Sequence, residues 1–260
     1  MAVSRLREAG LPLMNLLKLR GKPILEQLQL EERLLRTSSD NWCIINDGTN
    51  TPTIVMGISG KPSQLIEIEP VIRDRIHVIR RFSGGGTVIV DKGTVFVTFI
   101  CDKDAIPGLQ PYPHPIMSWT GQLYSTVFQG IPDFQLREND YAFGNRKFGG
   151  NAQSITKGRW IHHTSFLWEY DIKNMEYLKL PVKAPKYRSE RHHGEFLCQL
   201  KDFPILRSDF IEKAISSIGS YFSVEPVELK EILASSDAVY PHTTKLLALN
   251  ELQAFFPEVT

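Results

Sequence analysis

The sequence predicts a folded α+β domain in which helices flank a β-sheet. The chain has 260 residues, of which 42% are hydrophobic and 10% aromatic, and this composition supports a buried core rather than disorder. Short runs rich in β-branched and aromatic residues predict strands, and turn sequences such as Gly144-Asn145 predict hairpins between some of them. Apolar residues spaced three and four apart predict helices that cover the sheet.

The first strand is predicted over residues 13–19. Pro23 favours the start of a helix that has an apolar stripe and an outward polar face. The stripe consists of Ile24, Leu25, Leu28, Leu34 and Leu35, and the outward face of Glu31, Glu32 and Arg33. Further strands are predicted over residues 42–46, 53–58 and 77–80, and a short helix is predicted to start at Pro70.

A first hairpin is predicted in the middle of the chain. Its arms are residues 87–90 and 94–100, both rich in β-branched side chains, and they flank the turn Asp91-Lys92-Gly93. A helix over residues 114–128 follows, and we expect it to cover one face of the sheet.

A second hairpin is predicted around Gly144-Asn145. A two-residue turn there places Lys147 opposite Ala142, and a lysine opposite an alanine has room to reach inward. The next strand, over residues 160–168, carries the adjacent histidines His162 and His163, whose side chains must point to opposite faces.

The end of the chain, residues 201–260, is predicted to be helical. Asp209 and Glu212 have the spacing of a capping box for the first of these helices. Two further helices are predicted over residues 228–233 and 244–255.

Charge and cysteine usage restrict the possible partners and compartments. Lysine and arginine total 30 against 29 acidic residues, so no overall field favours nucleic acid or a membrane surface, and neither is expected as a partner. Cys43, Cys101 and Cys198 lie in apolar runs without zinc-ligand spacing, which predicts buried, reduced thiols and favours the cytoplasm. The segment Ser4-Arg5-Leu6-Arg7 is weakly similar to a transit peptide, so a mitochondrial or plastid location stays open.

The most informative stretch runs from Arg80 to Thr98 and contains Ser83, Gly84, Gly85 and Gly86. Three consecutive glycines after a strand leave backbone N–H groups uncovered, and such groups can form an anion-binding concavity. Arg80 and Arg81 add donors suited to a carboxylate or phosphate, although neighbouring strand residues diverge and only one is expected inside. The alternative is a plain glycine-rich turn flanked by solvated charges.

Several motifs together resemble the lipoate-protein ligase branch of the biotin/lipoate protein ligase family. Residues 80–86 resemble its Arg-Arg-x-Ser-Gly-Gly-Gly signature, residues 146–153 its lysine motif, Asn139-Asp140 its Asn-Asp pair, and residues 161–163 its paired histidines. The resemblance covers roughly residues 10–200. It implies a mixed, mainly antiparallel β-sheet flanked by helices. It also implies one catalytic domain over residues 1–260, with residues 201–260 as an extension and no separate accessory domain.

By this resemblance, the reaction is attachment of lipoate or octanoate to a lysine of a lipoyl domain through an acyl-adenylate. ATP, Mg²⁺ and lipoic acid or lipoyl-AMP are the implied cofactors and substrates, and Asp140 is the implied metal ligand. Lys147 would bridge the acyl oxygen and the phosphate as the catalytic cation. The residues implied to bind substrate or adenylate are Arg80, Arg81, Ser83, Gly84, Gly85, Gly86, Thr87, Asn139, Asp140, Gly150, Asn151, Ala152, His162 and His163. The implied acceptors are proteins of the 2-oxoacid dehydrogenase E2 or glycine cleavage H protein type.

The sequence departs from the family pattern at three places. Val90 stands where the family commonly has histidine, Thr94 where it has asparagine, and Thr164 where it has glycine. These changes could narrow substrate choice, slow adenylation or indicate a protein that binds without catalysis. A companion protein that completes the adenylation step is a further possibility.

Hypotheses other than a lipoate-protein ligase remain open. An acyltransferase that takes octanoate from a carrier would need an exposed, activated cysteine, and neither Cys101 nor Cys198 has such surroundings in the sequence. The glycine- and arginine-rich loop of biotin ligases is absent. The basic residues Arg188, Arg191, His192 and His193 form either a solvated turn or a contact for phosphate or the acceptor protein.

Overall fold

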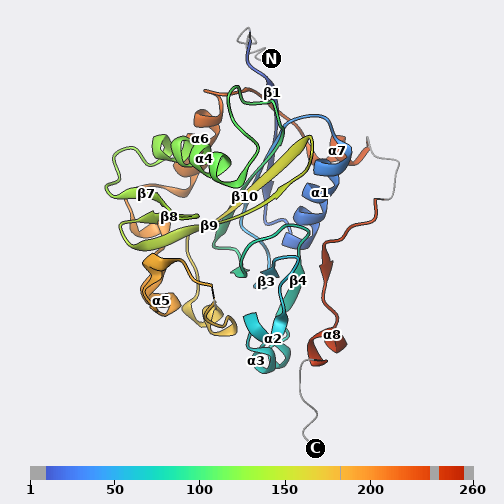
Figure 1. Ribbon diagram of the computed structural model, residues 1–260, viewed down its shortest axis with the longest axis vertical. Coiled ribbons are helices and arrows are strands. Elements are labelled where there is room, and N and C mark those ends of the chain that lie inside the picture. Colours follow the sequence, from blue (N-terminus) through green and yellow to red (C-terminus); the bar gives the residue numbers. More distant parts are fainter. Residues whose placement is uncertain (1–9, 182, 235–239, 255–260) are drawn as a thin grey trace, which may run out of the picture.

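The computed structural model describes residues 10–181, 183–234 and 240–254. In this part of the chain the strands form two sheets, an eight-stranded sheet of order β11-β1-β2-β6-β10-β9-β8-β7 and a four-stranded sheet of order β12-β4-β3-β5 (Figure 1). The large sheet contains β1 (Leu13–Arg20), β2 (Trp42–Asp47), β6 (Thr94–Asp102), β7 (Phe134–Arg137), β8 (Asp140–Phe143), β9 (Arg146–Ile155), β10 (Arg159–Leu167) and β11 (Ser223–Pro226). The small sheet contains β3 (Thr53–Met56), β4 (His77–Arg80), β5 (Val88–Val90) and β12 (Lys245–Leu246).

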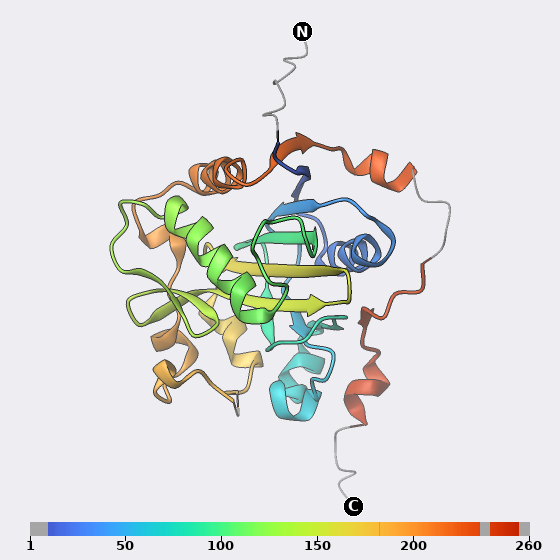
Figure 2. The same cartoon turned by 45° about the horizontal axis from the view of Figure 1, so that its top comes forward.

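Helices cover both faces of the large sheet and also pack against the small sheet. They are α1 (Ile24–Thr37), α2 (Pro62–Leu65), α3 (Ile68–Arg73), α4 (Pro113–Val127), α5 (His193–Phe196), α6 (Arg207–Ile218), α7 (Leu229–Ala234) and α8 (Leu249–Gln253). Short 3₁₀ helices span Ile172–Tyr177, Lys186–Arg188 and Leu200–Asp202. Figures 1 and 2 show α4 and α6 on one side of the large sheet and α1 on the other.

The alternation of side chains along the strands explains this layering. Val95, Val97 and Phe99 of β6 belong to the core cluster that contains the buried residues of α4 and α6. Ile100 of the same strand belongs to the cluster beneath α1. A strand that is buried on both faces needs apolar residues throughout, and β6 is buried from Thr94 to Cys101.

The predicted α+β class with a mainly antiparallel sheet is confirmed. In the large sheet β1 runs parallel to both β11 and β2, whereas the pairs from β2 through β6, β10, β9 and β8 to β7 are antiparallel. The predicted buried state of the three cysteines is also confirmed, since all of them are buried and free. None of the described helices has the length and apolar character needed to cross a membrane.

The hairpin predicted over residues 87–100 is wrong. β5 pairs with β3 in the small sheet, whereas β6 pairs with β2 and β10 in the large sheet. The turn between them therefore carries the chain from one sheet to the other. The turn is packed tightly, because a Cβ added to Gly93 would lie 2.2 Å from the backbone oxygen of Glu169.

The expectation that Glu31 and Glu32 face outward is also wrong, because both side chains are fully buried. Each carboxylate is satisfied by hydrogen bonds, most of them from residues that are distant in sequence. Glu31 accepts hydrogen bonds from Gln27 and Thr98, and Glu32 accepts them from Thr243 and Thr244. Burial raises the pKa of Glu32, but the hydrogen bonds from Thr243 and Thr244 outweigh it and lower the pKa overall.

Three predicted helix boundaries need correction. α6 starts at Arg207 after Leu206, so Asp209 lies in the first turn and is not the cap. α3 starts two residues before Pro70. Within 244–255, Lys245–Leu246 is a strand that pairs with β4, and the helix is only Leu249–Gln253. Residue 255, like the predicted transit-peptide segment 4–7, lies outside the described residues.

Candidate functional site

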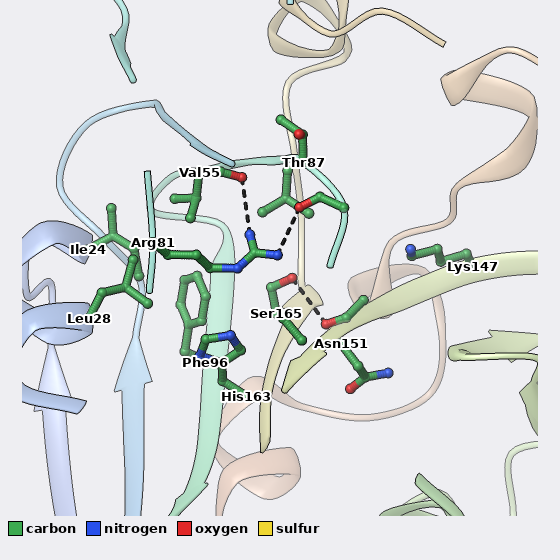
Figure 3. A pocket seen from close by; sticks show the side chains of 14 residues that line it. Ile24, Leu28, Val55, Arg81, Thr87, Phe96, Lys147, Asn151, His163 and Ser165 are labelled. Carbon is green, nitrogen blue, oxygen red and sulfur yellow. Dashed lines mark hydrogen bonds between the residues drawn. The ribbon is translucent and has the colours of Figure 1, made fainter. Parts of the chain in front are cut away.

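A pocket lies between the two sheets and contains most of the predicted site. Its volume of about 90 Å³ is several times the space that one water molecule needs. The apolar part of its lining consists of Ile24, Leu28, Val55, Val88 and Phe96. The remainder consists of Arg81, Gly86, Thr87, Lys147, Gly150, Asn151, Ala152, His163 and Ser165. Figure 3 shows Ile24 and Leu28 at one side of the view, Lys147 at the other and the guanidinium of Arg81 between them.

Residues 82–87, here called the glycine loop, connect β4 to β5. The loop is not a tight hairpin turn, because β3 lies between these two strands and pairs with both. Arg81 determines the shape of the loop: its Nη2 donates to the backbone oxygens of Gly84 (2.7 Å) and Gly86 (2.9 Å). Figure 3 shows the second of these bonds.

These two hydrogen bonds orient the backbone N–H groups of the loop. In a trans peptide the N–H points opposite to the preceding carbonyl, so the N–H groups of Gly85 and Thr87 point away from the guanidinium. Within the described part of the chain, neither N–H donates to a protein acceptor. The hydroxyl of Thr87 is likewise buried without a hydrogen-bond partner among these residues. The loop therefore has donors available for an anion, as predicted from its glycines.

Gly85 is the position where glycine is required. Its φ is +100°, and a Cβ there would lie 2.8 Å from Nη2 of Arg81 and 3.2 Å from Cβ of Ala152. Ala152 belongs to β9, so the glycine loop of the small sheet touches the large sheet directly at this point.

The two arginines diverge, as expected for neighbours in an extended segment. Arg80 points away from the pocket, and its Nη1 donates to the backbone oxygens of Ile58 and Gly60. Arg81 lies inside, where burial lowers its pKa to about 10 although the charge of Glu31 acts in the opposite direction. Its donors are engaged by the loop, so its role here is to shape the anion site, and the implied phosphate contact of Arg80 does not fit this geometry.

Lys147 reaches inward from β9, as predicted. It pairs with Ala142 across the hairpin, and its Nζ lies 2.7 Å from Oδ1 of Asp140. The other oxygen of Asp140 accepts a hydrogen bond of 2.9 Å from the hydroxyl of Tyr187. Gly150 leaves space for the lysine, because a Cβ there would lie 3.2 Å from Nζ. The result is an ammonium held at the pocket by a buried carboxylate.

The contacts of Asp140 favour an ion pair with Lys147 over the implied role of metal ligand. Both of its oxygens are engaged by Lys147 and Tyr187. Among the described residues there is no group of three or more His, Cys, Asp or Glu side chains that could hold a metal ion. The donor set around Asp140 is arranged for an ammonium, and a metal would have to compete with it.

The two histidines separate as strand geometry requires. His163 lines the pocket, and its ring nitrogens contact Ser83 Oγ and Glu31 Oε2, each at 3.0 Å. His162 lies on the opposite face, where Gln153 and Thr164 contact its ring. Burial, followed by the charge of His163, lowers the pKa of His162 to about 3. The structure therefore does not place His162 in the site.

The two asparagines of the implied site are also turned away from the pocket. The side chain of Asn151 bonds Thr164 Oγ1 (2.6 Å) and the backbone oxygen of Asn139 (3.0 Å). Asn139 itself is exposed in the turn before β8. Asn151, Gly150 and Ala152 nevertheless line the pocket along β9.

The basic segment before α5 is not a solvated turn at Arg188. This side chain is 5% exposed, and its guanidinium lies 4.8 Å above the ring of Phe196. Arg191 bonds backbone oxygens, including those of Tyr187 and Asn145. The segment supports Tyr187 and through it Asp140.

The cysteines have no features of a nucleophile. Burial raises the pKa of Cys198 to about 11 and that of Cys101 well above its usual value, so both are protonated near neutral pH. A carrier-dependent transferase that uses one of these thiols does not fit these surroundings.

The three residues that depart from the family pattern do not line the pocket. Val90 belongs to the buried cluster that contains the apolar lining residues Ile24, Leu28, Val55 and Phe96. Thr94 stabilises the turn before β6, where its hydroxyl accepts from the backbone N–H of Asp91. Thr164 lies on the face opposite the pocket, against Asn151.

Sequence reasoning missed Glu31, Tyr187 and the apolar lining as parts of the site. Ile24 and Leu28 appeared only as helical stripe residues, and no local signal distinguishes a stripe residue that lines a pocket from one that fills a core. Glu31 gave one indirect signal, since the neighbouring Gln27 and Leu28 place it near the inward face of a helix with 3.6 residues per turn.

Comparison with known proteins finds relatives among the lipoate-protein ligases. An "Inactive lipoate--protein ligase 2" of Plasmodium falciparum is 29% identical over 257 residues, covering 75% of this chain and 66% of that protein. "Lipoate-protein ligase LplJ" of Bacillus subtilis is 31% identical over 143 residues, covering 54% of this chain and 41% of that protein. The chain thus spans less than two thirds of the length of these relatives.

Solved structures show the same fold. A bi-partite lipoate protein ligase of Thermoplasma acidophilum has a TM-score of 0.68 at 16% identity, with 85% of this chain and 90% of that chain covered. LipL1 of P. falciparum in complex with lipoate has a TM-score of 0.67 at 18% identity, with 86% of this chain and 69% of that chain covered. Residues 23–218 match the family described as "Lipoyl protein ligase A/B catalytic domain". Because this match covers most of the chain, the protein belongs to the lipoyl protein ligase A/B catalytic-domain family.

Proposed function

We propose that this chain attaches lipoate or octanoate to the acceptor lysine of a lipoyl domain through an acyl-adenylate. The observation that carries the proposal is the pocket itself, in which an apolar lining lies beside the Lys147 ammonium and the glycine loop. An unbranched fatty acid has the same division into an apolar tail and an anionic head. LipL1 of P. falciparum, whose structure contains lipoate, supports lipoate as the acid.

The chemistry requires two anions to come together. A carboxylate attacks the α-phosphate of ATP, pyrophosphate leaves, and the acyl-adenylate forms; the acceptor amine then displaces AMP. The repulsion between carboxylate and phosphate is offset by a cation and by fixed N–H donors. Lys147 provides the cation, and Gly85 and Thr87 provide N–H groups that have no protein acceptor in the described chain. ATP would bring Mg²⁺ on its phosphates, as Mg²⁺ commonly binds.

A second candidate function is acyl transfer or binding without adenylation. The name of the P. falciparum relative, an inactive ligase, motivates this candidate, as do Val90 and Thr94. In that case the chain would use preformed lipoyl-AMP or depend on a companion protein. The bi-partite ligase of T. acidophilum, which was studied with its E2 lipoyl domain, supports both a companion and a lipoyl-domain acceptor.

Lipoate-dependent exchange between ATP and pyrophosphate tests the proposal. The wild-type chain should catalyse the exchange with lipoate or octanoate, and Lys147→Ala should reduce it on the order of 10²-fold or more because a cation at the transition state is lost. Lys157→Ala is the matched control, since that lysine is exposed in the turn between β9 and β10. Exchange that is unaffected by Lys147→Ala would overturn the role of Lys147.

A second assay separates the two candidates. If the wild-type chain shows no exchange but transfers the acyl group from added lipoyl-AMP to a lipoyl domain, it is a transferase. If it binds lipoyl-AMP and neither reaction occurs, with or without a companion protein, the chain binds the acyl-adenylate without catalysis and the ligase proposal is wrong.

A further inference from the structure

A chain of buried hydrogen bonds joins α1 to the glycine loop. Arg81 Nε lies 3.0 Å from Ser83 Oγ, Ser83 Oγ lies 3.0 Å from His163 Nε2, and His163 Nδ1 lies 3.0 Å from Glu31 Oε2. Ser83 is 1% exposed and Glu31 is fully buried. The chain ends at the residue directly before the three glycines, and it crosses from the large sheet to the small one.

For a neutral His163, every bond in this chain has one direction. Arginine can only donate, so Ser83 Oγ accepts from Arg81, and the carboxylate of Glu31 can only accept, so His163 carries a proton on Nδ1 and donates it to Glu31. Nε2 of the neutral ring is then an acceptor, and the hydroxyl of Ser83 donates to it. The hydrogen bonds thus select one neutral tautomer of His163.

The carboxylate of Glu31 is held in turn from its other side. Its Oε1 accepts hydrogen bonds from Gln27 Nε2 and Thr98 Oγ1, each at 2.7 Å. The amide of Gln27 cannot reverse, because its oxygen accepts from Asn46 Nδ2. The amide of Asn46 is fixed by the backbone N–H and oxygen of Lys22. An acceptor is therefore required at the Oε1 position of residue 31.

We propose that Glu31 is a positioning residue for the glycine loop, because it sets the tautomer of His163 and thereby the direction of the Ser83 hydroxyl and its bond to Arg81. The expected effect of Glu31 on catalysis rests on the proposed function, whereas its effect on the tautomer of His163 does not. The guanidinium of Arg81, which bonds Ser83, also donates to the backbone oxygens of Gly84 and Gly86 and so orients the glycine loop. A misdirected Ser83 would therefore disturb the donors that face the anion.

Glu31→Gln makes the proposal specific. The glutamine oxygen must face Gln27 and Thr98, which both donate, so its NH₂ group must face His163 Nδ1. His163 then has to carry its proton on Nε2, and the hydroxyl of Ser83 loses its acceptor. The substitution keeps the size of the side chain, so the fold should be retained.

The tautomer can be observed directly. Nitrogen NMR of protein labelled at its seven histidines, with the His163 signals assigned from a His163→Asn variant, should show the Nδ1–H form in the wild type and the Nε2–H form in Glu31→Gln. Glu32→Gln is the matched control, because this neighbouring buried carboxylate bonds Thr243 and Thr244 instead and should leave the tautomer unchanged. The same tautomer in wild type and Glu31→Gln would overturn the proposal.

Kinetics supply the second measurement. Glu31→Gln should lower lipoate-dependent exchange by about 10- to 100-fold, as expected when reacting groups are misplaced by a fraction of an ångström. In a Ser83→Ala background, Glu31→Gln should lower the exchange rate no more than about twofold, since the effects of two substitutions that act through one contact do not add. Equal losses in both backgrounds would show that Glu31 acts elsewhere. If the wild type shows no exchange, the proposed function fails, whereas the NMR result still decides the role of Glu31.

Discussion

The ammonium of Lys147 lies 2.7 Å from Oδ1 of Asp140, a residue of the neighbouring strand. A register shift between β8 and β9 at Tyr141 and Ala142 places Asp140 opposite Gly150. The long lysine side chain is therefore held over a glycine, at a defined position in the pocket. A cation that is positioned before the ligand arrives loses less entropy on binding.

The first prediction concerns this pair. Asp140→Asn should lower the free energy of unfolding by about 1 to 3 kcal/mol, because a charge-assisted bond to Lys147 is replaced by a neutral one. It should also raise KM for lipoate, since Lys147 loses its anchor. Denaturant unfolding and exchange kinetics measure the two effects. Tyr187→Phe removes only the second hydrogen bond to Asp140 and should have the smaller effect on KM; the reverse order would contradict this account.

The second prediction compares two glycines of the same loop. Gly85→Ala should destabilise the protein by about 1 kcal/mol or more and abolish most of the exchange, because φ is +100° and the new Cβ would lie 2.8 Å from Arg81. Gly86→Ala adds a Cβ with no neighbour within 4 Å and without a positive φ, so its unfolding temperature should change little. Similar thermal unfolding curves for both variants would show that the loop is not held as described.

The third prediction concerns stability at low pH. Burial, and next the charge of His163, lowers the pKa of His162 from 6.5 to about 3 in the folded protein. Between these values the unfolded chain binds a proton that the folded chain does not bind. The free energy of unfolding is therefore unaffected by the titration of His162 above pH 6.5, and it decreases as the pH falls from 6.5 toward 3. Between pH 7 and pH 5 this amounts to about 2 kcal/mol.

Urea unfolding at pH 7 and pH 5 measures this loss. His162→Gln should remove about 2 kcal/mol of the difference between the two conditions, because the titrating group is gone. His114→Gln replaces an exposed histidine and should keep the wild-type difference. An unchanged difference in His162→Gln would indicate that other groups cause the loss.

The fourth prediction concerns the apolar end of the pocket. Leu28→Phe should raise KM for octanoate and lipoate about tenfold, as is typical when a hydrophobic pocket loses space for a few methylene groups. Hexanoate, which needs less space, should be affected less. Exchange assays with the three acids in one variant provide their own control. Equal losses for all three acids would show that Leu28 does not limit chain length.

Local patterns predicted the parts of the site that depend on local geometry. The Gly144-Asn145 turn fixes the pairing of Lys147 with Ala142, and the strand repeat separates His162 from His163. The uncovered N–H groups follow from consecutive glycines. Each of these conclusions uses residues within a few positions of one another.

Apart from the starts of α3 and α6, the failures have one physical cause, which is competition from partners that are distant in sequence. Glu31 and Glu32 look like surface residues until His163 and Thr244 supply their hydrogen bonds. The segment after Asp91 looks like the second arm of a hairpin, but β2 and β10 offer it longer pairings than β5 does. The residue pattern of 244–246 gave no sign that β4 has a free edge to pair with.

The position of the pocket between two sheets has a dynamic consequence. Gly86 and Thr87 come from the small sheet side, whereas Lys147 and His163 belong to the large sheet. A ligand that contacts all four residues would act as a cross-link between the sheets, and the short Asp91–Gly93 connection is the covalent counterpart of that cross-link. Amide hydrogen exchange should therefore slow in β3 and β5 when the acid binds.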